Sequence, residues 1–312
     1  MFAISTKTGP IKFYDTFTGT CTKEFNDGNK YEIKFTSDEN KLIIYKDNVI
    51  KFLNVETLEI EREIINDTDI TCLDVNSDGT KIVIGEDSDT NCRVIDLESG
   101  ESLFTLRNIN RHNDVRFVCF DPNSNKFLFD SSNKELSVVD LDNNELIHVL
   151  SFEEKFNKLS FSPDGTKLVL CFGKSFVIKD STTYETLFTI NNNDTKFWPE
   201  VFFSPDSSTI ALINSENINT IYFYDTITGL KLGEILIDTG IITIKNFLGI
   251  VLNNFRCLNF DESGTYILFA HVDGILSVDV RNGDIKFKIE EKIKKNDSFI
   301  SFPRKSNIGS YI

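Results

Sequence analysis

The chain has 312 residues, of which 40% are hydrophobic, enough for a large buried core. It carries 48 acidic and 33 basic residues, and the resulting net charge of −15 argues against nucleic acid and anionic membranes as partners, because both are negatively charged. No run approaches the ~18 apolar residues of a membrane-spanning helix, and residues 1–12 are typical of a strand and a turn rather than a leader peptide. We therefore expect a cytoplasmic protein.

Six cysteines are scattered along the chain and include no Cys-x-x-Cys pair. Cytoplasmic cysteines are expected to be reduced and mostly buried, where they act as small apolar residues. The alternative is a set of three disulfides or a metal site, which this spacing does not favour. The six are Cys21, Cys72, Cys92, Cys119, Cys171 and Cys257.

The sequence repeats itself about every forty residues. An apolar residue followed by a turn-forming segment recurs at Phe35, Val75, Phe120, Phe161, Phe203, Phe260 and Phe302. A second anchor, an acidic or amide residue after an apolar run, recurs in phase at Asp15, Asn54, Asp96, Asp140, Asp180, Asp225 and Asp279. Two registers that share one period of this length are typical of β-propeller blades.

Residues 156–190 show how one repeat forms one blade. Alternating and near-continuous apolar runs predict strands over 156–161, 168–172, 176–180 and 185–190. The Ser-Pro-Asp-Gly segment at 162–165 places its residues where a type I turn favours them. Four short antiparallel strands make a blade that must stack on neighbouring blades to bury both faces. No stretch has a sustained helical period, so we expect almost no helix.

Taken in chain order, the repeats cover 1–27, 28–66, 67–110, 111–152, 153–194, 195–252 and 253–292. The first repeat lacks an innermost strand, and residues 293–312 contain a spare one near 298–302. Pairing the two ends predicts an all-β, seven-bladed β-propeller of four-stranded antiparallel blades. It would be a single domain over 1–312, with blade one closed by both chain ends, which leaves no exposed sheet edge.

Several of these segments carry a family resemblance. The turn at 162–165 and the third-strand endings at 94–100 and 221–226 resemble those of WD40-repeat β-propellers, and the resemblance covers essentially the whole chain. The segment 219–229 is also similar to the YVTN-like repeats of bacterial-type propellers. Both resemblances imply the same ring of blades, whereas the two families differ in function.

The sequence departs from the WD40 pattern at two dipeptides. The Trp-Asp pair does not occur, and the sole tryptophan, Trp198, lies elsewhere in the repeat. The Gly-His pair is also missing, with Arg111-His112 as its nearest counterpart. The hydrogen-bonded tetrad that these residues form in the family is therefore not expected here.

Candidate catalytic and metal-binding residues do not gather in the sequence. His112, His148 and His271 fall in three different repeats, which does not favour a histidine cluster. On the predicted innermost strands lysines alternate with carboxylates, as at Lys34 and Asp74, and this favours ion pairs over a bound cation. We therefore expect no catalytic residues, no metal and no cofactor.

Three connections that break the repeat are the candidate contact sites. The 57-residue step from Phe203 to Phe260 contains an apolar insertion over 238–254, which is either an exposed contact site or an added strand or loop folded onto the ring. The connection 108–113 is basic, and 196–199 holds the only tryptophan, which could also fill the core. All three enter innermost strands and so share one face. The predicted partner-binding residues are Arg111, His112, Arg116, Phe197, Trp198, Phe247, Leu248 and Ile250.

These observations favour a non-catalytic interaction scaffold of WD40-like type that presents one loop face to a partner protein or peptide. The alternative is a propeller enzyme, such as a metal-dependent lactonase-like hydrolase, which a calcium titration would separate from the scaffold. The identity of the partner and the oligomeric state are not predicted.

Overall fold

The computed structural model describes residues 1–6, 10–87, 91–106, 115–123, 125–132, 134–191, 200–213, 220–236, 258–261, 263–271, 274–281, 284–290 and 298–301. These residues form 28 strands, grouped in seven sheets of four strands, and contain no helix. Each sheet is one blade, so the fold is the all-β, seven-bladed β-propeller that the repeat predicts. Among the described residues, no helix has the length and apolar character needed to cross a membrane.

The strands divide between two compact units. The first unit holds four blades, which we number in chain order as one to four. Blade one is β28 (Ser298–Ser301), β1 (Phe2–Thr6), β2 (Ile11–Tyr14) and β3 (Cys21–Phe25). Blade two is β4 (Glu32–Phe35), β5 (Lys41–Lys46), β6 (Val49–Asn54) and β7 (Ile60–Ile65). Blade three is β8 (Ile70–Val75), β9 (Lys81–Glu86), β10 (Asn91–Asp96) and β11 (Ser102–Leu106). Blade four is β12 (Val118–Phe120), β13 (Lys126–Ser132), β14 (Glu135–Asp140) and β15 (Glu145–Ser151).

The second unit holds blades five to seven. Blade five is β16 (Lys158–Phe161), β17 (Lys167–Cys171), β18 (Ser175–Asp180) and β19 (Thr186–Asn191). Blade six is β20 (Glu200–Phe203), β21 (Thr209–Ile213), β22 (Thr220–Asp225) and β23 (Lys231–Leu236). Blade seven is β24 (Leu258–Phe260), β25 (Tyr266–His271), β26 (Gly274–Asp279) and β27 (Ile285–Glu290).

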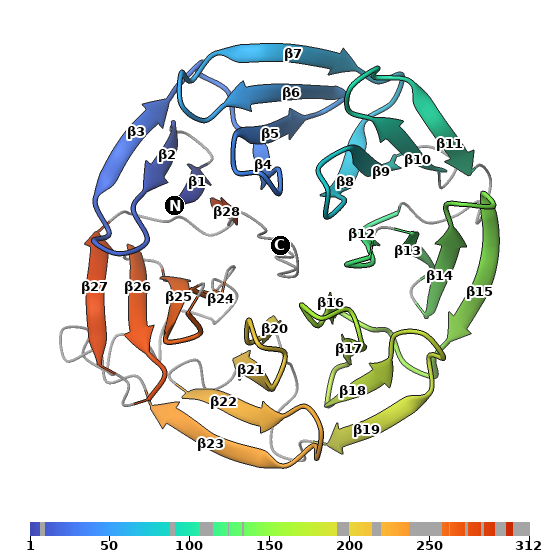
Figure 1. Ribbon diagram of the computed structural model, residues 1–312, viewed down its shortest axis with the longest axis vertical. Helices are drawn as coiled ribbons and strands as arrows, with labels where there is room; N and C mark the ends of the chain where they lie inside the picture. Colours follow the sequence, from blue (N-terminus) through green and yellow to red (C-terminus); the bar gives the residue numbers. More distant parts are fainter. Residues whose placement is uncertain are drawn as a thin grey trace. The chain divides into compact units, whose positions relative to one another are not determined.

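Blade one is built from both ends of the chain, as predicted. Its strand order is β28-β1-β2-β3, so the last described strand pairs with the first (Figure 1). The antiparallel register of β1 and β2 places Phe2 opposite Tyr14, and the two rings stack with their centroids 5.3 Å apart. The spare innermost strand expected near 298–302 is therefore β28.

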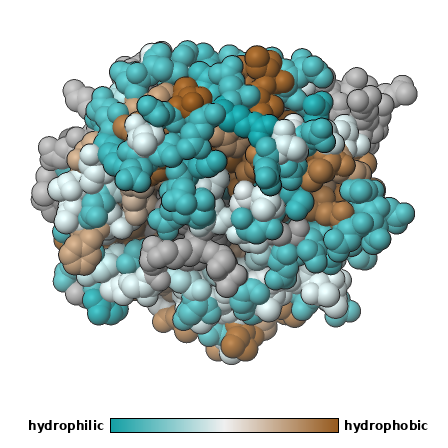
Figure 2. All heavy atoms as spheres, turned by 45° about the horizontal axis from the view of Figure 1, so that its top comes forward, coloured by the Kyte–Doolittle hydropathy of each residue, from teal (hydrophilic) through white to brown (hydrophobic). Residues whose placement is uncertain are grey.

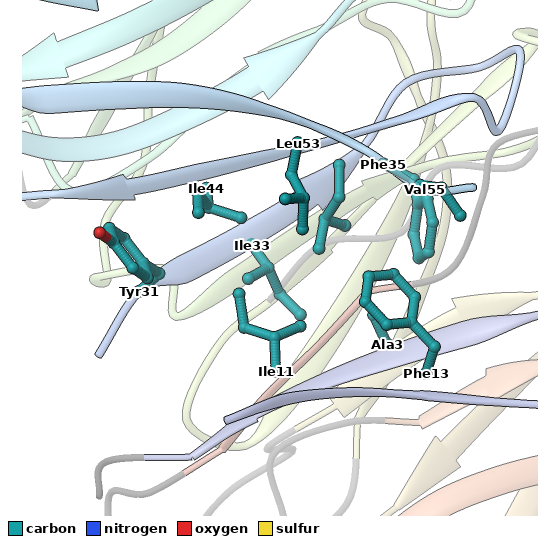
Figure 3. Close-up of a cluster of buried hydrophobic side chains, with 10 residues drawn as sticks. Ala3, Ile11, Phe13, Tyr31, Ile33, Phe35, Ile44, Leu53 and Val55 are labelled. Atoms are coloured by element: carbon teal, nitrogen blue, oxygen red, sulfur yellow. The ribbon is translucent and has the colours of Figure 1, made fainter. Parts of the chain in front are cut away.

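The core consists of apolar side chains from facing blades. Between blades one and two, Phe13 of β2 meets Phe35 of β4 edge to face, with ring centroids 6.4 Å apart (Figure 3). Between blades three and four, Phe127 is fully buried among Phe104, Phe120 and Phe129. The second unit has matching clusters between blades five and six and between blades six and seven.

The fourth strand of each blade is its exposed strand. In β7, β15 and β19 most residues are exposed, and the half-buried ones alternate with them. Single apolar side chains therefore reach the surface, among them Ile65, Leu103, Val149 and Leu187. On the displayed face, apolar residues form separate patches among hydrophilic ones (Figure 2). Scattered apolar residues of this kind are normal at a protein surface.

The second sequence anchor caps the turn after the third strand of each blade. In blade six, Asp225 Oδ1 accepts hydrogen bonds from the N–H groups of Ile227 (3.0 Å) and Thr228 (2.6 Å). The next residue, Gly229, has a φ of +69°, a conformation that favours glycine. The same side-chain cap recurs at Asp15, Asn54, Asp96, Asp140 and Asp180. The fixed spacing between the anchor and the turn glycine is therefore set by hydrogen bonds and backbone conformation within the turn itself.

Acid should destabilise these turns below about pH 4. At Asp15, Asp96, Asp180 and Asp225 the pKa of the carboxyl is lowered, first because the N–H of the third residue along donates to the carboxylate. The folded pKa lies below the unfolded value, so the stabilisation is complete above the unfolded pKa and is lost as the pH falls through the folded pKa. The urea concentration at the midpoint of unfolding, measured at several pH values between 7 and 2.5, should decrease as the pH falls below about 4.

Blade two supplies the control for this prediction. Its cap is Asn54, whose amide oxygen accepts the N–H groups of Glu56 (2.9 Å) and Thr57 (3.0 Å) without titrating. A variant that carries asparagine at the four caps with a lowered pKa, Asp15, Asp96, Asp180 and Asp225, should keep the turns and lose less stability on acidification than the natural protein. An equal loss in both proteins would show that these caps do not contribute to the acid sensitivity.

Candidate partner-binding site

One of the eight contact residues predicted from the sequence lies in the described part of the chain. Arg116, which precedes β12, is that residue. The other seven lie outside the described residues: Arg111, His112, Phe197, Trp198, Phe247, Leu248 and Ile250. The insertion 238–254 and the connections 108–113 and 196–199 also lie outside them.

Arg116 fixes the entry to blade four. Its guanidinium Nη2 lies 2.8 Å from Oδ2 of Asp130 on β13, whose side chain is only 2% exposed. Oδ1 of the same carboxylate accepts the backbone N–H groups of Arg116 and Phe117, each at 2.8 Å. Burial raises the pKa of Asp130, and the Arg116 cation and these two N–H donors oppose that shift. The described contacts of Arg116 are thus those of a residue that holds its own blade together.

The innermost strands of the first unit carry an ion pair, as their alternating charges predict. Lys34 Nζ of β4 lies 3.1 Å from Asp74 Oδ1 of β8, and both side chains are buried. Asp74 Oδ2 accepts the N–H of Phe120 in β12 at 2.9 Å. Blades two, three and four are joined through this one carboxylate. In the described residues, no group of three or more His, Cys, Asp or Glu side chains could hold a metal ion.

The described cysteines do not form disulfides with one another. The five are Cys21, Cys72, Cys92, Cys119 and Cys171, and the last three are buried. Burial raises the pKa of the thiols of Cys72 and Cys92 well above the ordinary value. These two thiols are therefore in the protonated, unreactive form at neutral pH.

A small hollow in the first unit lies at the ends of blades two and three. It has a volume of about 320 Å³ and contains Glu32, Tyr45, Asp69 and Asp87 among its lining residues. Tyr45 Oη donates to Glu32 Oε2 at 2.6 Å, and burial raises the pKa of both groups. The Tyr45 hydroxyl and the Glu32 carboxyl are therefore hydrogen-bonded to each other.

One position of the fourth strand has a special place in every blade. In each blade a β-bulge interrupts the pairing of the third and fourth strands. We call the fourth-strand residue of the last pair before this bulge the cover position. Its occupants, from blade one to blade seven, are Lys23, Arg62, Phe104, His148, Phe188, Gly233 and Phe287. Six of the seven are large side chains and one is a glycine.

Where the cover residue is basic, it caps the turn of the following blade. Lys23 Nζ donates to the carbonyl oxygens of Val55 (2.9 Å) and Glu56 (3.1 Å) in blade two. Arg62 does the same in blade three with three carbonyl oxygens, those of Leu97 (2.9 Å), Glu98 (2.8 Å) and Ser99 (2.6 Å). The cover residue thus satisfies backbone acceptors in the turn after the third strand.

Where the cover residue is aromatic, it fills the same space by packing. Phe188 of blade five lies so close to Gly229 of blade six that a Cβ there would come within 3.0 Å of its ring. Phe104 of blade three meets Phe127 of blade four edge to face, with centroids 6.3 Å apart. In blade five an aromatic residue therefore covers the neighbouring turn, as a basic residue does in blades one and two.

Blade six has no cover side chain, and a groove lies where it would be. A Cβ built on Gly233 would meet no atom within 4 Å. The groove has a volume of about 740 Å³ and lies between blades six and seven, within the second unit. Its walls include Phe223 and Leu232 of blade six and Val280 and Arg281 of blade seven. We call it the Gly233 groove.

Apolar side chains are exposed on the hairpin of blade six that contributes Leu232 to the Gly233 groove. Ile227, Leu230 and Leu232, all in or next to the turn between β22 and β23, are 71%, 66% and 58% exposed. They make this hairpin the most exposed apolar segment of the described blades, which is typical of a contact surface. The acidic side chains that line the groove are Asp206 and Glu234.

The charges of the groove have partners within the protein. Glu234 Oε2 lies 2.6 Å from Lys231 Nζ. The Arg281 guanidinium holds Asp279 through Nε (2.8 Å) and Nη2, and this contact lowers the pKa of Asp279 to about 2. The Asp279 carboxylate is therefore ionised at neutral pH, and it balances the Arg281 cation.

The sequence contains a signal for this groove that the search for irregular connections misses. In every repeat the cover position follows the turn residue by four, as Arg62 follows Leu58 and Gly233 follows Gly229. Aligned on that turn, the repeats show six large side chains and one glycine. The distinguishing feature is a missing side chain in phase with the repeat, whereas a motif search looks for side chains that are present.

Two strand glycines should respond oppositely to alanine. At Gly85 of β9 a Cβ would lie 2.6 Å from Cys72 Sγ and 2.9 Å from Val115 Cγ1, whereas at Gly233 it would meet nothing. Gly85→Ala should lower the free energy of unfolding by about 1–3 kcal/mol through overpacking. Gly233→Ala should leave it unchanged or raise it by about 0.5–1 kcal/mol, because glycine weakens a strand. Urea unfolding of both variants checks this, and a comparable loss for Gly233→Ala would mean that the groove is not open.

The comparisons with known proteins agree with the fold. Residues 62–96 match the family model of the WD domain, G-beta repeat. Among solved structures, the Kuenenia stuttgartiensis hydrazine synthase is similar, with a TM-score of 0.65 and 15% sequence identity over 79% of this chain and 75% of that one. At this identity the similarity concerns the fold alone. No curated protein matches the sequence. The repeat match and the seven four-stranded blades together support a β-propeller of WD40-like type.

Proposed function

We propose that the protein is a non-catalytic interaction scaffold and that the Gly233 groove binds a segment of a partner protein or peptide. The observation that carries this proposal is the cover position of blade six. In the described part of the chain, blade six offers no cover side chain to the turn of blade seven, although the six other cover positions hold a large residue. A side chain of a partner can occupy the space that a cover side chain fills in the other blades.

The walls of the groove favour binding over chemistry. The turn before β21 holds Asp206 in place, because Oδ1 accepts the hydroxyl of Ser204 (2.5 Å) and the N–H of Ser208 (3.0 Å). Glu234 is engaged by Lys231. Carboxylates that are ionised and hydrogen-bonded in this way are poor proton donors, whereas they suit a fixed, preorganised binding surface.

Filling the groove should abolish partner binding without harming the fold. Gly233→Phe introduces the aromatic cover residue of blades three and five, and Leu187→Phe adds the same ring to an exposed position of β19 as a matched control. Each protein is used as bait, and the captured proteins are quantified by mass spectrometry beside thermal melts. The proposal expects a partner that Leu187→Phe retains and Gly233→Phe loses at an undiminished melting temperature. Identical capture by all three proteins would contradict it.

We propose the connections that were selected from the sequence as a second contact surface. The only basis for this proposal is that they interrupt the repeat. This surface comprises Arg111, His112, Arg116, Phe197, Trp198, Phe247, Leu248 and Ile250. The double substitution Phe247→Asp with Leu248→Asp tests it, because an exposed pair should lose binding at an unchanged melting temperature. If the double variant unfolds, the insertion belongs to the core and is not an interface.

A further inference from the structure

We infer that the Gly233 groove receives an arginine side chain of the partner, which takes the place of the missing cover residue. This inference rests on the proposed function and specifies its chemistry. The protein itself provides the template, because Arg62 of blade two performs the same task for blade three.

The acceptors are the turn carbonyls of blade seven. Val280 and Arg281 follow Asp279 as Leu97 and Glu98 follow Asp96 in blade three, and both line the groove. In blade three the guanidinium of Arg62 donates to these carbonyls from the cover position. Val280 and Arg281 line the same groove as Gly233, and Gly233 leaves the cover position of blade six without a side chain. A guanidinium that enters the groove from outside therefore meets the counterparts of Leu97 and Glu98, two of the residues whose carbonyls accept from Arg62.

The apolar walls suit the stem of an arginine. Phe223 pairs directly with Gly233 across the strands, and Leu232 and Val280 complete the lining on either side. An arginine buries its methylene stem along such surfaces while its head group forms hydrogen bonds. Lysine suits the site less well, because a planar guanidinium can donate to several carbonyls at once, as Arg62 does with three.

The charge of the site attracts a cation. Asp206 and Glu234 line the groove, and Glu234 is paired with Lys231. Asp206 has no cation among its described hydrogen-bond partners, and the hydroxyl of Ser204 lowers its pKa, which keeps it ionised at neutral pH. The single cation of the lining, Arg281, is bound to Asp279. The chain as a whole has a net charge of −15, which adds a long-range attraction for basic segments.

Peptide libraries test the inference directly. Four fluorescent pentapeptide libraries share random flanking residues and differ in the central residue, which is Arg, Lys, Phe or Ala. Fluorescence anisotropy measures their binding to the intact protein, to Gly233→Arg and to Glu234→Gln. We expect the Arg library to bind at least about tenfold more tightly than the Ala and Phe libraries. Gly233→Arg fills the groove with the protein's own guanidinium and should abolish this preference.

The variants separate the possible failures. Glu234→Gln leaves the groove open. It should weaken binding of the Arg library several-fold and leave binding of the Phe library unchanged. This variant therefore tests the inference even if Gly233→Arg folds poorly. A Phe library that binds most tightly and depends on Gly233 would overturn the arginine inference and leave the scaffold function standing. Arg binding that persists in Gly233→Arg would place the contact elsewhere and overturn the inference. If neither a peptide nor a captured protein depends on Gly233, both proposals fail.

Discussion

A protein that ends at residue 297 should be less stable than the full chain by at least about 3 kcal/mol, because it lacks β28. Without that strand, β1 becomes an edge and its N–H and C=O groups lose their partners on one side. Phe2, Ala3 and Ile4, which are no more than 1% exposed, would also lose their cover. Urea unfolding of the truncated and full proteins measures the difference.

A second truncation provides the control. A protein that ends at Ser301 keeps β28 and lacks the eleven residues after it. It should unfold close to the full chain. If the proteins that end at 297 and 301 have the same unfolding midpoint, β28 does not stabilise blade one, and the closure of this blade by both chain ends is wrong.

Asp130→Ala should lower the free energy of unfolding by about 3–5 kcal/mol. The Asp130 carboxylate is almost fully buried, and it accepts two backbone N–H groups besides the guanidinium of Arg116. Alanine would leave the N–H groups of Arg116 and Phe117 without an acceptor in the interior. Thermal and urea unfolding of the variant check the expected loss.

Asp130→Asn distinguishes the two contributions of this side chain. Its amide oxygen can still accept the two N–H groups, whereas the ion pair with Arg116 is lost. We expect a smaller loss, about 1–2 kcal/mol. A loss as large as that of alanine would mean that the charge, and not the acceptor geometry, holds the entry to blade four.

The fold could be predicted because its determinants are local and recur. Asp225 and its counterparts cap a turn through bonds that span two and three residues, and Gly229 adopts a positive φ next to them. Such requirements leave a mark in every repeat at the same spacing, and seven copies make the mark visible. The spare strand at the end of the chain was predictable for the same reason, since it completes an otherwise incomplete unit.

The groove could not be predicted in the same way, because it depends on contacts between repeats. Arg62 covers a turn 35 to 37 residues farther along the chain, so its role is invisible within one repeat. Gly233 breaks neither the strand pattern nor the spacing, and only the register identifies it as a cover position. Sequence reasoning therefore selected the irregular connections, whose residues lie mostly outside the described part of the chain.

Nuclear magnetic resonance can show whether the Gly233 groove binds an arginine side chain. The ¹⁵N-labelled protein is titrated with N-acetyl-arginine methylamide, and the same titration is repeated with the Gly233→Phe variant. We expect saturable shifts of the amide signals of Gly233, Glu234 and Arg281, with no such shifts in the variant. Shifts at other blades, or equal shifts in the filled variant, would contradict it.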